Sequence, residues 1–196
     1  MLISHQRLTD TPVMSLQTGS QLAVTERIIV DPRDLTICAY ELTGPLLDER
    51  PSFLRPVDVR ELSNLGLIVD SSDEFVGLDD VIVIKQVHDY NFNLVGLDVI
   101  DEKKKKLGKI IGFNVDSESF SVQQLVVKRP LFKSFGETEL LIHRSQVVEI
   151  RDNFVKVKSA VSEEPTRQPV AEYANPFRAG GIQPETIDTE TQWPYA

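Results

Sequence analysis

The sequence contains one pattern of apolar and turn residues twice, and this repeat constrains the fold more than any other feature. Val30-Asp31 returns as Val115-Asp116, an offset of 85 residues. At that offset further apolar residues coincide: Leu22 with Leu107, Leu35 with Phe120, Ile37 with Val122, Tyr40 with Leu125 and Leu42 with Val127. From residue 54 the offset is 88, which pairs Leu54 with Ile142, Val59 with Val147, Leu67 with Val155 and Val69 with Val157. The pattern predicts a tandem duplication of a β unit of about 65 residues.

The second copy begins with a segment that reads as a β-hairpin, residues 107–130. Its two arms, residues 108–115 and 120–127, are rich in Ile, Val and Phe, which favour strands. The intervening residues 116–119 are turn formers, whose side chains can accept hydrogen bonds from nearby backbone N–H groups. Several short strands separated by turn signals, roughly every 8–12 residues, predict a small barrel or sandwich. A unit this small has little room for a ligand cavity, which argues against an enzyme.

The chain divides into five segments by composition and periodicity. They are a lead-in (1–12), a first β unit (13–72), a connector (73–93), a second β unit (94–158) and a tail (159–196). Residues 81–87 of the connector are apolar enough for a strand or a buried connector, so we expect the connector to pack on one or both units. The tail is acidic and almost without periodicity, which predicts a mostly disordered segment.

The second unit carries Gly108-Lys109-Ile110 at the start of its hairpin, Val115-Asp116 at the end of the first arm and Val147-Val148 before its last strands. In these features it resembles the PRC-barrel family. Residues 13–72 match more weakly, with Ala23 at the position of Gly108. The resemblance implies an all-β fold of two tandem small PRC-type β-barrels. It also implies a binding or assembly module that has no catalytic residue set.

The net charge of −9 is unevenly distributed along the chain. Residues 13–72 and 73–93 each carry −4, residues 94–158 carry +3, and the tail carries −4. This polarity could steer partners or support homodimerisation through opposite-charge faces. No apolar run approaches the roughly 20 residues of a membrane helix, and no secretory signal is evident, so we expect a cytoplasmic protein. The single cysteine, Cys38, is expected to be a small buried residue.

The sharpest charged feature is a run of four lysines before Leu107: Lys103, Lys104, Lys105 and Lys106. One interpretation is a contact with an anion, such as RNA phosphate, an acidic lipid or an acidic partner. The other is a solvated hairpin turn, which is the more common origin of such a run. Asp101 and Glu102 flank the run and weaken the interpretation as an anion site.

The tail carries two short motifs with aromatic residues. They consist of Asn175, Pro176 and Phe177, and of Trp193 and Tyr195 around Pro194. Aromatic side chains dominate binding hot spots, so these residues are candidates for partner anchors. A tail without any binding role is the equally open alternative.

Residues that could carry catalysis or bind a metal do not form a recognisable set. His5, His88 and His143 are scattered, without a second His or Cys at ligand spacing. Asp79-Asp80 and Glu163-Glu164 are adjacent in sequence, so on a strand their side chains face opposite sides. We therefore expect no enzyme, no cofactor and no metal. The sequence favours a protein-interaction scaffold or adaptor, and the alternative is an RNA- or ribosome-associated factor that uses the basic second unit.

Overall fold

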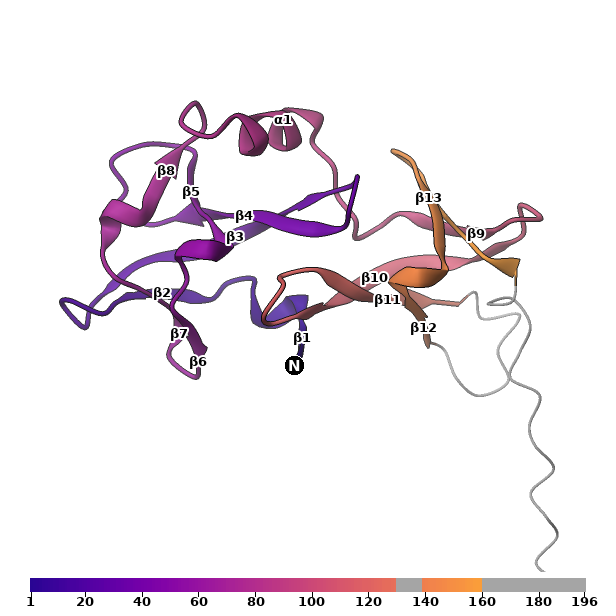
Figure 1. Cartoon of the computed structure of the whole chain (residues 1–196), viewed down its shortest axis with the longest axis horizontal. Coiled ribbons are helices and arrows are strands. Elements are labelled where there is room, and N and C mark those ends of the chain that lie inside the picture. The colour runs from indigo at the N-terminus through magenta and orange to yellow at the C-terminus, as the bar shows by residue number, and fades with distance from the viewer. Residues whose placement is uncertain (130–138, 160–196) are drawn as a thin grey trace, which may run out of the picture. The chain divides into compact units, whose positions relative to one another are not determined.

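The computed structural model describes residues 1–129 and 139–159, which all lie in one compact unit, Met1–Glu163. This part of the chain is mostly β and forms two seven-stranded sheets (Figure 1). It also contains one α-helix, α1 (Ile82–Tyr90). The prediction of a β-rich fold is confirmed, and α1 is a single nine-residue helix added to it.

The first sheet is built from residues 12–77. Its strands are β2 (Pro12–Ser15), β3 (Gln21–Asp31), β4 (Thr36–Thr43), β5 (Ser52–Leu54), β6 (Glu61–Ser63), β7 (Gly66–Val69) and β8 (Phe75–Gly77). Their spatial order is β6-β7-β2-β3-β4-β5-β8. All pairs are antiparallel except β2 and β7, which are parallel.

The second sheet combines residues 98–157 with a strand from the N-terminus. Its strands are β9 (Asp98–Asp101), β10 (Lys106–Asp116), β11 (Val122–Lys128), β12 (Glu139–His143), β13 (Val147–Ile150), β14 (Phe154–Val157) and β1 (Leu2–Ser4). The order is β12-β11-β10-β9-β14-β13, and β1 pairs with the C-terminal end of β10. The predicted hairpin is therefore β10 and β11, although Phe120 lies in its turn, with φ 51°, rather than in its second arm.

Six strands of each sheet occupy equivalent places, as the repeated sequence pattern predicts. β2 to β7 correspond in order to β9 to β14, including the parallel pair, which recurs as β9 and β14. The 3-10 turn Pro56–Asp58 has its counterpart at Arg144–Gln146. The two repeats differ in what is added: β8 extends the first sheet, and β1 pairs within the second.

Neither sheet closes into a complete barrel through hydrogen bonds between its described strands. The end strands are β6 and β8 in the first sheet and β12 and β13 in the second, and no pairing joins the two ends of either sheet. One buried apolar cluster nevertheless contains side chains from both sheets. Its largest fully buried members include Tyr40, Leu54 and Leu67 from the first repeat and Ile110, Leu125 and Ile142 from the second.

The apolar part of the connector is a helix rather than a strand, and two of its side chains are buried as the alternative of a buried connector predicts. Ile84 and Val87 of α1 are three residues apart and therefore fall on one helical face. They pack on Ile29, Ala39 and Phe53 of the first sheet in a second apolar cluster. Burial on this sheet face outweighs the β preference of the Ile- and Val-rich run. The expectation that the connector packs against the β units is met by α1.

Candidate binding surfaces

The lysine run forms the turn between β9 and β10, and a buried carboxylate holds its backbone. Asp101 is 1% exposed, and its Oδ1 accepts a hydrogen bond from the Lys105 N–H at 2.8 Å. The Lys104 N–H donates to the Asp101 carbonyl at 2.9 Å, and Lys104 has φ 62°. Lys103, Lys104, Lys105 and Lys106 are all exposed. Lys106 forms an ion pair with Asp98 at 2.6 Å, so three lysines remain for an external anion.

The equivalent turn of the first repeat is one residue longer, carries no charged side chain and is also held by a buried polar residue. Ser15 takes the place of Asp101, is 4% exposed and accepts a hydrogen bond from the Thr18 N–H. Gly19, with φ 68°, takes the place of Lys104. The turn conformation therefore does not require lysine, and the basic side chains are additional to what folding needs.

The last described residues of the chain lie against the same turn. The Ser159 N–H donates to the Glu102 carboxylate at 3.0 Å, and this contact lowers the pKa of Glu102. The acidic tail therefore begins next to the lysine turn.

The tips of the two long hairpins meet through a symmetric pair of backbone hydrogen bonds. The Ile37 N–H donates to the Phe120 carbonyl at 2.9 Å, and the Val122 N–H donates to the Leu35 carbonyl at 2.8 Å. At the offset of 85, Leu35 corresponds to Phe120 and Ile37 to Val122. Leu35 and Phe120 also share a positive φ, 57° and 51°. The repeats are thus joined by a local two-fold pairing of equivalent residues, as in an isologous dimer interface.

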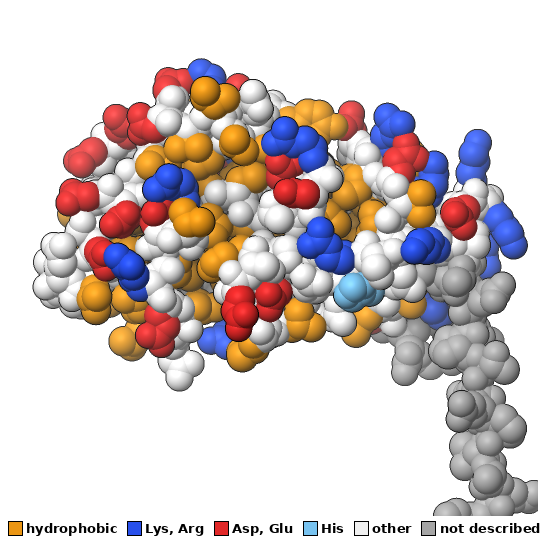
Figure 2. All heavy atoms as spheres, viewed as in Figure 1, with side chains coloured by type: hydrophobic (Ala, Val, Ile, Leu, Met, Phe, Trp, Pro, Cys, Tyr) orange, Lys and Arg blue, Asp and Glu red, His pale blue; other side chains and the backbone are white. Residues whose placement is uncertain are grey.

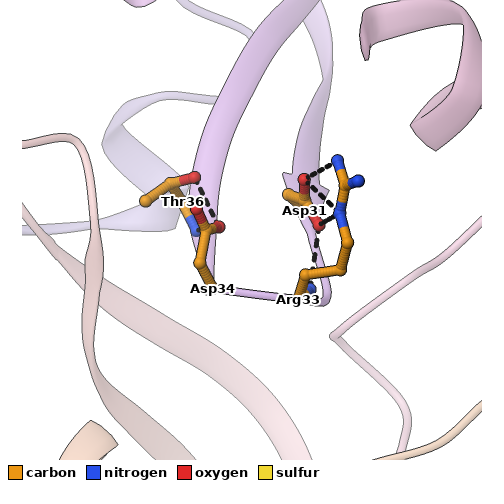
Figure 3. Close-up of polar contacts among 4 residues, drawn as sticks. All are labelled: Asp31, Arg33, Asp34 and Thr36. Atoms are coloured by element: carbon orange, nitrogen blue, oxygen red, sulfur yellow. Dashed lines mark hydrogen bonds and ion pairs between the residues drawn. The ribbon is translucent and has the colours of Figure 1, made fainter.

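Figure 3 shows the first hairpin tip, where Asp31 and Arg33 form a closed ion pair. The Arg33 guanidinium donates to both Asp31 oxygens, at distances from 2.5 to 3.0 Å. This hydrogen bonding lowers the pKa of Asp31. Asp34 accepts from the backbone and hydroxyl of Thr36 in the same turn. These carboxylates stabilise the turn.

Two cavities lie where a hairpin tip of one repeat approaches the short strands of the other. The first, about 350 Å³, is lined by Leu62 and Asp116 among others, and by Ile3 and Leu8 of the N-terminal segment. The second, about 400 Å³, is lined by the equivalent residues Ile150 and Asp31, and by Tyr90 and Val87 of α1. The two are therefore counterparts under the repeat, each bordered by a different non-repeated segment. Asp116 is already paired with the Met1 ammonium group at 3.1 Å, as Asp31 is with Arg33.

Helix α1 presents apolar side chains outward as well as inward. Ile82 is 72% exposed, Tyr90 53% and Val83 47%. Together with exposed Gln86 they form one stripe along the helix, because residues four apart share a face. Figure 2 shows apolar side chains exposed between charged ones on the face drawn, with basic side chains gathered toward the second sheet. The sequence alone does not indicate this stripe, because the apolar run of residues 81–87 is typical of a strand or a buried connector.

The scattered histidines and the cysteine have structural surroundings. His5 stacks on Phe113, and burial lowers its pKa. His88 lies edge-on to Phe53, and His143 caps a 3-10 turn by accepting from the Ser145 N–H. Cys38 is half-buried, and burial raises the pKa of its thiol to about 11, which keeps it protonated. Among residues 1–129 and 139–159 no three His, Cys, Asp or Glu side chains form a metal-binding group.

The tail residues Asn175, Pro176, Phe177, Trp193 and Tyr195 lie outside the described residues. No helix in the described part of the chain is both long and apolar enough to span a bilayer. Comparison with models of known protein families gives no match, and comparison with curated proteins gives no significant match.

Proposed function

We propose that this protein is a non-catalytic interaction scaffold, built from two PRC-type barrel units and acting in the cytoplasm. The observation that carries the proposal is the outward stripe of α1, formed by Ile82, Val83, Gln86 and Tyr90. An apolar stripe of this kind, including an aromatic residue with a polar tip, is typical of protein-binding surfaces. The family resemblance of the second repeat supports the same class of function.

The stripe is suited to binding because the rest of the helix already fixes its position. Ile84, 1% exposed, and Val87, 6% exposed, anchor α1 on the first sheet. The Tyr90 hydroxyl also donates a hydrogen bond to the Asp152 carboxylate, in the turn that precedes β14. A partner therefore meets a pre-organised surface and does not bear the entropic cost of ordering it.

Photo-crosslinking and binding measurements test this surface together. A photoreactive residue at Gln86 should trap a partner, and the purified partner should then bind the wild-type protein. Substituting Ile82→Glu and Val83→Glu should weaken that binding at least tenfold, because carboxylates would be buried in an apolar contact. Val57→Glu is the matched control, since Val57 is 80% exposed but lies on the Pro56–Asp58 turn. Equal affinities for all three proteins would exclude the stripe as the binding surface.

The alternative function is an RNA- or ribosome-associated factor that uses the lysine turn. It is favoured by one observation, the exposure of Lys103, Lys104 and Lys105 beyond the needs of the turn. Binding through phosphates should weaken steeply with salt, with a slope of about −0.7 per phosphate contacted on single-stranded RNA. The triple alanine variant should reduce that slope by about 2 in filter-binding titrations. Unchanged RNA binding when all four lysines, including Lys106, become alanine would eliminate this function.

A further inference from the structure

The first of the two cavities, of about 350 Å³, has a wall of buried apolar side chains. It lies where the tip of the β10–β11 hairpin approaches β6 and the N-terminal segment, so the small size of each repeat does not limit it. Its buried apolar lining includes Ile3, Leu8, Leu67 and Val115. Ligand pockets in proteins typically have volumes of about 300–1,000 Å³ and a mostly apolar lining. The first cavity is at the small end of this range and suits a small ligand with an apolar part.

Four ionisable side chains also line this cavity, and two of them are already paired. Asp116 pairs with the N-terminal ammonium group, and the Arg60 guanidinium donates to both oxygens of Asp70, at distances from 2.6 to 3.2 Å. In the described part of the chain, neither the Arg7 guanidinium nor the Glu61 carboxylate has a hydrogen-bond or ion-pair partner. The cavity lining therefore retains one free positive group and one free negative group.

The second repeat shows that the fold does not require this carboxylate to be free. Glu149, the counterpart of Glu61, forms ion pairs with its cross-strand neighbour Lys156 and with Arg151. In the first repeat Ile68 takes the place of Lys156 opposite Glu61, and a serine takes that of Arg151. The residues that neutralise the carboxylate in one repeat are thus absent from the other, and the carboxylate stays available to a ligand.

The second cavity provides a comparison, because its charged lining residues neutralise each other. They are Asp31 and Arg33, which form the closed ion pair shown in Figure 3. Of the two cavities, the first alone combines a buried apolar wall with unpaired groups of opposite charge.

We propose that the first cavity binds a free α-amino acid with an apolar side chain, of the class of leucine and phenylalanine. Such a zwitterion has a carboxylate for Arg7, an ammonium group for Glu61 and an apolar side chain for the buried wall, and both ionic contacts are charge-assisted hydrogen bonds. A ligand with only one of the two charges would gain one contact and meet a like charge at the other. The inference goes beyond the proposed function and does not depend on the α1 stripe.

Calorimetric titration of the full-length protein tests the class of ligand. Leucine should bind about tenfold or more tightly than N-acetyl-leucine, which lacks the ammonium group, and than leucinamide, which lacks the carboxylate, because each loses one charge-assisted hydrogen bond. Glycine should bind about tenfold or more weakly than leucine, because it lacks the apolar side chain. Equal affinities for leucine and either derivative would overturn the proposal. Absence of binding by both leucine and phenylalanine at millimolar concentrations would also overturn it.

Two variants test the two charged groups separately. Arg7→Gln should weaken leucine binding about tenfold without weakening leucinamide binding, since leucinamide has no carboxylate to lose its partner. Glu61→Gln should weaken leucine binding to the same degree without weakening the binding of N-acetyl-leucine. Wild-type affinity for leucine in either variant would overturn the proposal.

A substitution that fills the cavity tests the location. Ser117→Trp should abolish leucine binding, because Ser117 lines the cavity and an indole would occupy its volume. Glu118→Trp is the matched control, since Glu118 is the next residue of the same turn, is exposed and lies outside the lining, and it should bind leucine as the wild type does. Circular dichroism melts establish that both variants are folded. Undiminished binding in folded Ser117→Trp would place the ligand elsewhere and overturn the proposal.

Discussion

At the residue scale, Tyr40 places a polar hydroxyl group in the apolar core of the first repeat. Its side chain is fully buried, its hydroxyl has no hydrogen-bond partner among the described residues, and burial raises its pKa. The second repeat has Leu125 at the equivalent place, where no polar atom is buried. An unsatisfied buried hydroxyl costs about 1–3 kcal/mol.

Tyr40→Phe should therefore stabilise the protein by about 1 kcal/mol, because it removes the buried polar atom and keeps the ring. Urea unfolding followed by circular dichroism measures the change. Tyr90→Phe serves as the comparison, since the Tyr90 hydroxyl is exposed and hydrogen-bonded to Asp152. A loss of stability in Tyr40→Phe would reveal that the hydroxyl has a bound water as its partner.

Also at the residue scale, the two repeats place a glycine at different positions of their equivalent strand pairs. A Cβ on Gly108 would lie 2.2 Å from the Lys128 carbonyl oxygen, so the second repeat needs glycine there. The first repeat has Ala23 at this position and places Gly44 opposite it, where an added Cβ would lie 3.3 Å from the Ala23 Cα. The first repeat thus has alanine where the second needs glycine, and it has a glycine close to that alanine on the neighbouring part of the chain.

At the element scale, the β3–β4 turn depends on the ionisation of Asp31. The Arg33 guanidinium lowers the pKa of Asp31 below its unfolded value, so the carboxylate stabilises the fold above the unfolded pKa. This stabilisation should disappear as the pH falls through the folded pKa. Arg33→Ala should therefore destabilise the protein at pH 7, and its stability should approach that of the wild type as the pH falls through the folded pKa of Asp31.

Urea unfolding of both proteins, from pH 7 down through the acid range in which Asp31 is protonated, measures this difference. The size of the effect at pH 7 is modest, because Arg33 itself is largely exposed and screened by solvent. Arg151→Ala, in the exposed pair with Glu149, provides a reference for a surface ion pair in the second repeat. A difference between wild type and Arg33→Ala that persisted unchanged after Asp31 is protonated in the folded protein would contradict the role of Asp31 ionisation.

Some secondary-structure elements could be predicted from the sequence, and others could not. The hairpins and their equivalence in the two copies could be predicted, because Val30-Asp31 and Val115-Asp116 mark the same strand end in both. Helix α1 could not, because Ile82, Val83 and Ile84 favour strands locally and only the apolar face of the first sheet makes a helix preferable. The lysine turn was located correctly, but its support by buried Asp101 becomes visible only in three dimensions.

At the scale of the whole molecule, the two repeats are not structurally independent. β1 precedes the first repeat in sequence but pairs with β10 of the second sheet, matching Ile3 with Val115. Leu8, 2% exposed, follows it in the shared apolar cluster. The hairpin tips add the two symmetric backbone hydrogen bonds. The sequence pattern contains no signal for the pairing of β1 with the second sheet, because a three-residue strand has no periodicity to detect.

Because β1 pairs with β10 and Leu8 lies in the shared apolar cluster, we expect a destabilising substitution near the N-terminus to affect both sheets. Ile3→Ala should destabilise the protein by about 2–4 kcal/mol, because Ile3 is 6% exposed in the shared core. Hydrogen exchange detected by mass spectrometry should show faster global opening in peptides from both β3–β4 and β10–β11. Leu2→Ala, at a residue 48% exposed, should change exchange in neither. Faster opening confined to β10–β11 in Ile3→Ala would mean that the repeats unfold separately, and that the shared core does not make the described unit cooperative.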